Sequence, residues 1–435
     1  MSLSHYIRTS LNIKDENITF SDEFVTDESI KGVTCKVYHA TLSYTPTHCE
    51  CCGTLFDSKI TKHGFKPSRI TLPKMAQFNT YLNLKKQRYF CSHCHSTFTC
   101  QTSLVEKNCH ISSSTKHAIF IDAQRKKSEC DIAYDHNVSH CTVSRTINTF
   151  YEEKQLNLHY LPESLCFDEF KSVKHTKGAM SFIYCDATSG EILDILEDRT
   201  YNTLYHYFMR FPRRTRKKVK RVVIDMYSPY MKLIKAVFPK AKIILDKFHV
   251  VQLMNRALNR TRIAVMNQHK NTPYYTRLKK YWRLLQMNQS ELNPHHHFHC
   301  RSFKKYVSTQ EIVDYLLSNS AELKATYEFV QAARHSIKVS KISSLVCLLQ
   351  SPSAQLSSFM LTAINSMKKH LQFIKNMMRS TLTNGVIEGI NNKIKVIKRI
   401  AFGYRSFYHF KARILIIHSQ SILNKKHKKK HSVSA

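Results

Sequence analysis

Three acidic residues, far apart in the sequence, stand where their side chains could hold a divalent metal ion. Asp225 directly follows the apolar run 222–224, Asp168 follows a second apolar run, and Glu388 lies near the start of a helical segment. Eight of the twelve residues from Arg210 to Arg221 are arginine or lysine. A lone carboxylate would repel a phosphodiester backbone, but a carboxylate that holds a metal among cations suits chemistry on nucleic acid. For each acid taken alone, an ordinary turn or helix-end residue is the competing interpretation.

Two of these acids are expected on a mixed sheet. The runs 181–185 and 192–196 flank a turn and predict a β-hairpin, which follows the strand that leads to Asp168. Helices and strands then alternate as far as Asp246, with Asp225 at the end of a strand. Three antiparallel strands followed by alternating helices and strands are the layout of an RNase H-like fold. In that fold the metal-binding carboxylates project from the first and fourth strands, and Asp168 and Asp225 occupy those places.

The third acid is expected on a helix. Apolar residues recur with helical spacing at Val386, Ile390, Ile394 and Ile397, whereas Glu388, Asn392, Lys395 and Arg399 fall on a separate face. Glu388 thus begins a polar stripe whose other end is cationic. This arrangement suits a carboxylate that points at a metal while Lys395 and Arg399 follow a DNA backbone.

The composition indicates a polyanionic partner. Lysine and arginine number 67 against 31 acidic residues, which gives a formal net charge of +36. We expect double-stranded DNA as the partner, with an anionic membrane surface as the alternative. The chain has no uninterrupted apolar stretch of about 18 residues and begins without a signal-peptide core, which predicts no membrane span and a cytoplasmic, nucleoid-associated protein. The backbone contacts predicted in the basic run are Arg213, Arg214, Arg216 and Lys217.

Two cysteine pairs predict a structural zinc site. Two residues separate Cys49 from Cys52 and Cys91 from Cys94, and 38 residues lie between the pairs. Two residues between thiolates let both sulfurs face one tetrahedral Zn²⁺, and two such pairs complete its coordination. Cys51 and nearby histidines are spare ligands, and unligated reduced cysteines are the alternative. The pattern indicates a zinc ribbon, in which four thiolates leave no open position for catalysis.

Three helical segments follow the cysteine pairs. Capping serines at 112, 128 and 139 predict helices that reach about residues 127, 137 and 150. A short helix, a tight turn and a second helix with a polar face form the plan of a helix-turn-helix domain. The residues expected to contact DNA from the last helix are His140, Thr142, Ser144, Arg145 and Asn148. Helix packing without DNA contact is the alternative.

These patterns divide the chain into segments. Residues 191–384 contain no glycine and are rich in helix formers from about residue 250, which predicts an all-helical insertion. The lysine-rich end has no apolar periodicity, which predicts disorder. We therefore expect a multidomain α+β protein with an N-terminal segment (1–45), a zinc ribbon (46–104), a helix-turn-helix domain (105–155), an RNase H-like catalytic domain (160–250 and 381–420), a helical insertion (251–380) and a basic disordered tail (421–435).

In their order and spacing these motifs resemble the transposases of the bacterial ISL-three family of insertion sequences. The likeness runs from about Cys49 to His418 and rests on the zinc ribbon, the helix-turn-helix and the motifs Asp168-Glu169-Phe170, Val223-Ile224-Asp225-Met226, Asn384-Gly385-Val386-Ile387-Glu388 and Gly403-Tyr404-Arg405-Ser406-Phe407. The resemblance implies that Asp168, Asp225 and Glu388 form the metal-binding triad of a DDE transposase. It also implies that His249, in an Asp-x-x-His motif, lies beside the scissile phosphate or the flanking strand. A structural histidine is the alternative there.

The resemblance further implies two-metal phosphoryl transfer. Two Mg²⁺ ions about 4 Å apart, which Mn²⁺ can replace, would be shared by the three acids. The protein would bind terminal inverted repeats, cut DNA and join the freed 3′ hydroxyl to target DNA, as a homodimer or higher oligomer on DNA. A sequence-specific DNA-binding regulator, or an inactive transposase, is the main alternative and predicts binding without metal-dependent nicking. A tyrosine recombinase is disfavoured, since the His-x-x-Arg motif it needs occurs only at residues 5–8, at the wrong end of the chain.

Overall fold

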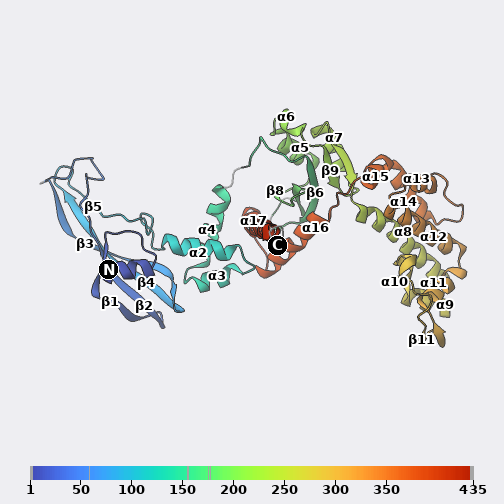
Figure 1. The fold of residues 1–435 in the computed structure, drawn as a ribbon, viewed down its shortest axis with the longest axis horizontal. Coiled ribbons are helices and arrows are strands. Elements are labelled where there is room, and N and C mark those ends of the chain that lie inside the picture. The colour runs from blue at the N-terminus through green and yellow to red at the C-terminus, as the bar shows by residue number, and fades with distance from the viewer. Residues whose placement is uncertain (1–2, 58, 154–155, 175, 177, 432–435) are drawn as a thin grey trace. The chain divides into compact units, whose positions relative to one another are not determined.

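The computed structural model describes residues 3–57, 59–153, 156–174, 176 and 178–431 of the chain (Figure 1). The chain divides into two compact units. Unit 1 comprises residues 1–155, 173–175 and 394–435, and unit 2 comprises residues 156–172 and 176–393. Among the described helices, none is both long enough and apolar enough to cross a membrane.

Unit 1 begins with a short helix and a five-stranded sheet. These elements are α1 (Leu3–Ser10), β1 (Ile18–Ile30), β2 (Val33–Leu42), β3 (Ile60–Met75), β4 (Phe78–Cys91) and β5 (Ser96–Thr99). The strand order is β1-β2-β4-β3, with β5 also paired to β4, and only the β2–β4 pair among these described strands is parallel. β2, which precedes the boundary expected at residue 45, pairs with β4, the strand that ends on Cys91.

Three helices follow this sheet in unit 1. They are α2 (Ser113–Ala123), α3 (Glu129–Asp135) and α4 (His140–Glu153). The serine before each helix accepts a hydrogen bond from a backbone N–H of the first turn, at 3.1 Å for Ser112, 3.0 Å for Ser128 and 3.3 Å for Ser139. All three helices therefore start at the predicted capping serines. Ile119, Ile132, Val143 and Ile147 are fully buried among them.

The C-terminal helix α17 (Phe407–His431) packs on these three helices. Ala412 and Ile416 belong to the same buried cluster as the isoleucines of α2, α3 and α4. The guanidinium of Arg413, only 1% exposed, donates to the carbonyl oxygens of residues 123, 125 and 127, at and just beyond the C-terminal end of α2. Those carbonyls carry the negative end of the helix dipole, so they compensate the buried cation. The described part of α17 belongs to unit 1, and the expected catalytic-domain boundary at residue 420 stays a prediction.

The end of the chain also differs from the expectation of a disordered tail from residue 421. α17 continues through the lysine-rich stretch to His431, while residues 432–435 lie outside the described residues. No glycine or proline follows Gly403 in the sequence, and lysine is a good helix former, so nothing in this stretch terminates the helix.

Unit 2 contains a second five-stranded sheet. Its strands are β6 (Ser164–Lys171), β7 (Met180–Asp186), β8 (Ile192–Leu196), β9 (Arg221–Ile224) and β10 (Lys242–Leu245), in the order β10-β9-β6-β7-β8. β6, β7 and β8 are antiparallel neighbours, whereas β9 runs parallel to both β6 and β10. Leu165 pairs with Val222 and Cys166 with Val223, so Asp168, two residues further along β6, comes level with Asp225.

Different helices contact the two faces of this sheet. The helices on one face are α5 (Tyr201–Met209), α6 (Arg213–Arg216) and α7 (Ser228–Val237), where the ring of Phe167 stacks on Phe208 with 5.4 Å between centroids. The opposite face of β6 meets the start of α16 (Gly385–Ile400). The buried apolar residues of α16 are Ile387, Ile390, Ile394 and Ile397, so Val386, 37% exposed, was wrongly placed on the apolar stripe.

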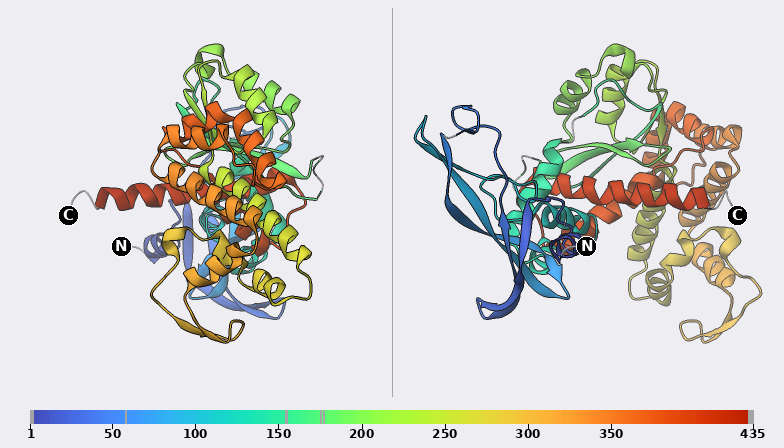
Figure 2. Two further views of the ribbon diagram at one scale, coloured as in Figure 1. Left: turned by 90° about the vertical axis from the view of Figure 1, so that its right-hand side faces the viewer. Right: turned by 60° about the vertical axis from the view of Figure 1, so that its left-hand side comes forward.

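The long insertion of unit 2 is mainly helical (Figure 2). Its helices are α8 (Lys247–Gln268), α9 (Pro273–Lys280), α10 (Trp282–Gln286), α11 (Thr309–Ser318), α12 (Ala321–Lys338), α13 (Ile342–Gln350), α14 (Ser358–Lys369) and α15 (Leu371–Met378). The prediction of an all-helical insertion is wrong, because β11 (Phe298–Cys300) and β12 (Lys305–Val307) form an antiparallel hairpin. Cys300 and Val307 are buried, and Lys304 takes a positive φ of 53° in the turn, a conformation that the hairpin needs although this segment contains no glycine.

A residue with a strained backbone lies just after α16 and leads to a first prediction. Phe402 has a φ of 52°, is 99% exposed, and its backbone N–H donates to the carbonyl of Arg399 at 3.0 Å. Glycine is preferred at such a position, because a side chain in the left-handed region costs roughly 1–2 kcal/mol. We expect Phe402→Gly to raise the free energy of unfolding by about 1 kcal/mol in urea denaturation, with Phe402→Ala giving a smaller change. A lower stability for the glycine variant would show that the ring makes a stabilising contact.

Candidate active site and metal centres

The carboxyl ends of β9 and β10 bring two aspartates and a histidine together. Asp225 follows β9 and Asp246 follows β10, and these strands are parallel neighbours. His249, in the first turn of α8, places its Nε2 3.0 Å from Asp225 Oδ1 and 3.8 Å from Asp246 Oδ2. One ligand atom from each of the three lies within 4.8 Å of the others, which is close enough for all three to contact one metal ion. In the described part of the chain, only this group and the four cysteines gather so closely.

The start of α16 connects Asp168 to this group. Asn391 Nδ2 donates to Asp168 Oδ2 at 2.9 Å. Asn384, the residue before α16, donates from Nδ2 to Asp225 Oδ1 at 3.5 Å and from its backbone N–H to Asp246 Oδ1 at 3.4 Å. The two asparagines therefore hold aspartates of three neighbouring strands around one end of the sheet.

The electrostatics of the aspartates favour a bound cation. The pKa of Asp168 is raised to about 7, mainly by burial, with the charges of Asp225 and Glu169 adding to the rise and a backbone N–H opposing it. Burial also raises the pKa of Asp225 to about 7, with the charges of Asp246 and Glu169 adding to the effect. Carboxylates that repel one another in a buried place are stabilised by a divalent ion between them.

Two buried oxygen atoms beside the aspartates fit the same interpretation. Asn384 and Asn391 are 5% and 8% exposed, and the Oδ1 atom of each has no hydrogen-bond partner among the described residues. A buried acceptor without a partner is costly, unless it binds a cation or the water on one. The site thus offers carboxylate and amide oxygens, the ligands that Mg²⁺ and Mn²⁺ prefer, together with one imidazole.

Glu388 lies on the α16 face that meets the aspartates. Its backbone N–H donates to the carbonyl of Asn384 at 3.0 Å, and Asn391 follows three residues later. Positions 384, 388 and 391 share one side of a helix. The Glu388 carboxylate is exposed and is not among the described groups whose ligand atoms lie within 4.8 Å of one another. Its part in a triad with Asp168 and Asp225 therefore stays a prediction.

Glu169 points away from this centre. Because side chains alternate along a strand, it faces α7, where Tyr230 Oη donates to it at 2.9 Å and Arg199 forms an ion pair with it. The guanidinium of Arg199 also lies 4.9 Å from the ring centroid of Tyr227. This network orders the strand that presents Asp168.

The sequence predicted Asp168, Asp225 and His249 as site residues, which the structure places near one another, but it predicted no role for Asp246, Asn384 or Asn391. Asp246 had a usable signal, since it ends an apolar run as Asp225 does. The sequence signal for the two asparagines was weaker. Asn384 lies four residues before Glu388 and Asn391 lies three residues after it, on the same helical side.

The position of Asn391 leads to a second prediction. Asn391→Ala removes the amide that holds Asp168, and loss of such a supporting contact typically costs 10- to 100-fold in metal affinity. We expect Mn²⁺ to bind about 10- to 100-fold more weakly to the variant, measured by isothermal titration calorimetry. Gly389→Ala is the matched control on the same helix, because its added Cβ would meet no atom within 4 Å. Equal affinity in wild type and Asn391→Ala would show that the amide does not support the centre.

The raised pKa values lead to a third prediction, on pH. Each folded-state pKa, about 7, lies above the ordinary value of 3.8, so the stabilisation from these groups is complete below about pH 3.8 and is lost as the pH rises through 7. Protons and metal compete for the same carboxylates. We therefore expect the increase in melting temperature caused by Mg²⁺ to grow between about pH 5.5 and about pH 8. The double variant Asp168→Asn, Asp225→Asn should lose this pH dependence, and an unchanged dependence would contradict the assignment.

The predicted DNA contacts differ in their exposure. Seven of them are exposed: His140, Arg145, Arg213, Arg214, Lys217, Lys395 and Arg399. Ser144 and Asn148 are half-buried, and Asn148 Oδ1 lies 2.8 Å from Nδ1 of His409 on α17. Two predictions need correction. Thr142 is buried in the cap of α4, and Arg216 is buried with its guanidinium donating to the carbonyls of Phe211 and Val237 at 3.1 and 2.8 Å.

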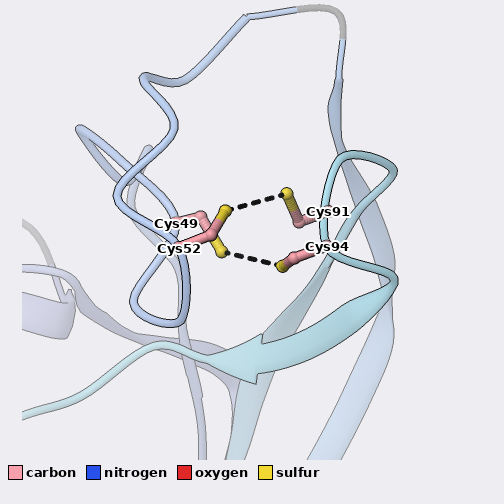
Figure 3. Close-up of side chains that lie close together, drawn as sticks. All are labelled: Cys49, Cys52, Cys91 and Cys94. Atoms are coloured by element: carbon pink, nitrogen blue, oxygen red, sulfur yellow. Dashed lines mark hydrogen bonds between the residues drawn. The ribbon is translucent and has the colours of Figure 1, made fainter.

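The four predicted cysteines come together in unit 1. Figure 3 shows Cys49 and Cys52, from the loop after β2, facing Cys91 and Cys94, at the end of β4. The sulfur atoms of Cys49 and Cys94 are 3.7 Å apart, and those of Cys52 and Cys91 are 3.8 Å apart. Sulfurs at the corners of a tetrahedron with Zn–S bonds of about 2.3 Å lie about 3.8 Å apart. The geometry fits one structural Zn²⁺.

Comparison with known proteins gives the class and then the family. A family model described as a zinc finger of the transposases IS204, IS1001, IS1096 and IS1165 matches residues 45–94, which include all four cysteines. The model of the ISL3 DDE transposases, described as "Transposase", matches residues 165–414, more than half of the chain. The chain belongs to this family.

The individual relatives match only part of this chain. The transposase of insertion sequence element IS1001 from Bordetella parapertussis is 29% identical over 261 residues, which are 58% of this chain and 60% of that protein. A Lactococcus lactis subsp. lactis protein described as an ATP-dependent protease is 36% identical over 124 residues, or 28% of this chain and 40% of that protein. The chain thus spans less than two thirds of either. The Drosophila P element transposase strand transfer complex has a TM-score of 0.35 and 9% identity, over 72% of this chain and 92% of that one.

Proposed function

We propose that this protein is a DDE transposase that binds the terminal inverted repeats of an insertion sequence, cuts DNA beside them and joins the ends to target DNA. The observation that carries the proposal is the meeting of Asp168, Asp225, Asp246 and His249 at one end of a sheet, in a chain of net charge +36. Family membership adds the class of reaction.

The strand order of unit 2 supports an RNase H-like fold for the catalytic domain. Three antiparallel strands are followed by two strands that run parallel to the first, and Asp168 and Asp225 stand on the first and fourth of them. In unit 1, α3 and α4 with the turn at Asn137, whose φ is 50°, support a helix-turn-helix. We assign α4 to the DNA major groove. His140 and Arg145 are exposed on this helix.

In the reaction, Asp168, Asp225 and Glu388 would hold two divalent ions, Mg²⁺ or Mn²⁺. When bound, such ions supply an activated water and stabilise a leaving 3′ oxygen. His249, 3.0 Å from Asp225, orients that carboxylate, while Asn384 and Asn391 fix the aspartates relative to each other. These contacts would keep the carboxylate oxygens in place for the metal ions.

Two displacements at phosphorus complete the proposed sequence. In the first, water attacks the phosphate at the transposon end, its O–P bond forms and the bond to the 3′ oxygen breaks. In the second, that 3′ hydroxyl attacks a target phosphate and displaces another 3′ oxygen. The exposed cations Arg213, Arg214 and Lys217 would bind the DNA backbone, as would Lys395 and Arg399 on α16. An assembly with two DNA ends needs at least two copies of the chain.

The test is cleavage of a labelled duplex that carries the terminal repeat of the element, with wild-type protein in Mg²⁺ and in EDTA. We expect nicking at the repeat boundary in Mg²⁺ and none in EDTA. Tight, sequence-specific binding with no nicking in either Mg²⁺ or Mn²⁺ would instead indicate a DNA-binding regulator or an inactive transposase.

A further inference from the structure

A histidine of the C-terminal helix lies between two helices of the proposed helix-turn-helix. His409, on α17, places its Nδ1 2.8 Å from Asn148 Oδ1 on α4, and its Nε2 2.7 and 2.9 Å from the two carboxylate oxygens of Glu129 on α3. The side chains of His409 and Glu129 are 12% and 6% exposed. All three residues belong to unit 1. The function proposed above gives His409 and Glu129 no role.

Both ring nitrogens of His409 face oxygen acceptors. An ionised carboxylate only accepts, so the Nε2 that faces Glu129 carries a hydrogen. Asn148 Oδ1 also accepts, so Nδ1 carries a hydrogen as well, and the imidazole is a cation beside the buried carboxylate. His140 Nε2 lies 3.5 Å from the same carboxylate. Glu129 therefore holds the ring of His409 in place from α3.

This contact determines which end of the Asn148 amide is left for another partner. The oxygen accepts from His409, and none of the described residues accepts a hydrogen bond from the NH₂ group. Asn148 is half-buried and lies on the same side of α4 as the exposed His140, two helical turns earlier. The helix assigned to the major groove thus presents a hydrogen-bond donor at this position.

The chemistry of the donor selects the base. In the major groove, guanine presents two acceptors, N7 and O6, whereas adenine presents one acceptor beside a donor and cytosine presents a donor. An asparagine with both ends of its amide available pairs with adenine through both of them. Since the oxygen of Asn148 is held by His409, the remaining NH₂ group suits guanine.

We propose that His409 is a positioning residue for sequence recognition: it holds the amide oxygen of Asn148, so that the NH₂ group donates to a guanine of the terminal repeat. The inference rests on the proposed function for the identity of the DNA. It adds that α17, which lies outside the helix-turn-helix, helps to select the base that α4 reads.

The test uses the full chain and terminal-repeat duplexes in which one guanine at a time is replaced by 7-deazaguanine, whose C–H takes the place of the N7 acceptor. We expect one guanine whose replacement weakens wild-type binding by about five- to tenfold, seen as fluorescence anisotropy. Asn148→Ala should reduce this ratio to about one. Thr149→Ala is the matched control, because Thr149 is the next residue of α4 and is exposed, and it should keep the ratio.

Two replacements of His409 separate positioning from mere anchoring of α17. The Nδ2 of an asparagine takes the place of the ring Nδ1 and can donate to Asn148, whereas the Nε2 of a glutamine takes the place of the ring Nε2 and can donate to Glu129. We expect His409→Asn to keep the ratio and His409→Gln to reduce it to about one. Because the ratio compares two DNAs on one protein, a uniform loss of affinity does not change it.

The inference and the proposed function fail in different ways. A ratio kept by His409→Gln, or lost by His409→Asn, would overturn the inference. If wild type nicks its repeat in Mg²⁺ but the effect of 7-deazaguanine depends on Asn148 at no position, the transposase assignment stands and the inference fails. If wild type does not prefer the terminal repeat to unrelated DNA, the proposed function fails, and the inference fails with it.

Discussion

Asp225→Asn should lower the rate of Mg²⁺-dependent cleavage of the terminal-repeat duplex by on the order of a thousandfold, which corresponds to about 4 kcal/mol of transition-state stabilisation. The amide keeps the shape of the side chain but not its charge, and Asp225 makes the shorter contact with His249, at 3.0 Å. DNA binding should stay within about twofold of wild type, because the proposed backbone contacts come from exposed cations elsewhere. Single-turnover cleavage and filter binding measure the two quantities.

A second aspartate of the same sheet provides the control for this effect. Asp186 ends β7, pairs with Leu165 and accepts hydrogen bonds from Thr188 and Ser189 in the hairpin turn. Asp186→Asn should cleave at close to the wild-type rate. If Asp186→Asn were as slow as Asp225→Asn, the loss would reflect damage to the sheet. If Asp225→Asn kept full activity, this end of the sheet would not be the site of chemistry.

Cys91→Ser should remove the zinc and with it the binding of the terminal repeat. Cys91 has no exposed surface, and a structural zinc site contributes on the order of 10 kcal/mol to the folding of small zinc domains. Metal analysis should find one zinc fewer per chain, and specific DNA affinity should fall by at least about a hundredfold. Mn²⁺ binding at the acidic centre should survive, because Asp225 and its partners belong to unit 2.

The neighbouring cysteine tests whether the effect belongs to the ligand set. Cys51 is exposed and is not one of the four cysteines whose sulfurs gather within 4.8 Å. Cys51→Ser should therefore keep both zinc and DNA affinity. Zinc retained in full by Cys91→Ser would mean that the metal sits on other residues.

The residues that the sequence predicted best lie at the ends of regular elements. An apolar run that stops at Asp225 forms a strand and ends there, and serines at 112, 128 and 139 cap helices, because these signals act over a few residues. The cysteine pairs were also directly predictable, because two residues between thiolates let both sulfurs face one metal ion. For the strand end and the helix caps, the local pattern and the final contact involve the same short segment.

Other features depend on contacts between distant segments. Nothing in the basic run distinguishes Arg216 from Arg213, yet only Arg216 meets buried carbonyls of Phe211 and Val237. Arg413 of α17 donates to three carbonyls at and after the end of α2, and these acceptors lie almost 290 residues earlier in the sequence. Asn391 looked like one more polar residue of a helix, and its role is defined by Asp168 on another element.

We propose that Asp168 and Asp225 hold divalent metal where DNA is cut. The measurement for this assignment is Mn²⁺ binding, followed by electron paramagnetic resonance, in complexes of the full chain with a pre-cut DNA end. Wild type should bind Mn²⁺ at the acidic centre, and the double variant Asp168→Asn, Asp225→Asn should lose those ions while it still binds the DNA. The same number of ions, bound with the same affinity in both proteins, would contradict the account.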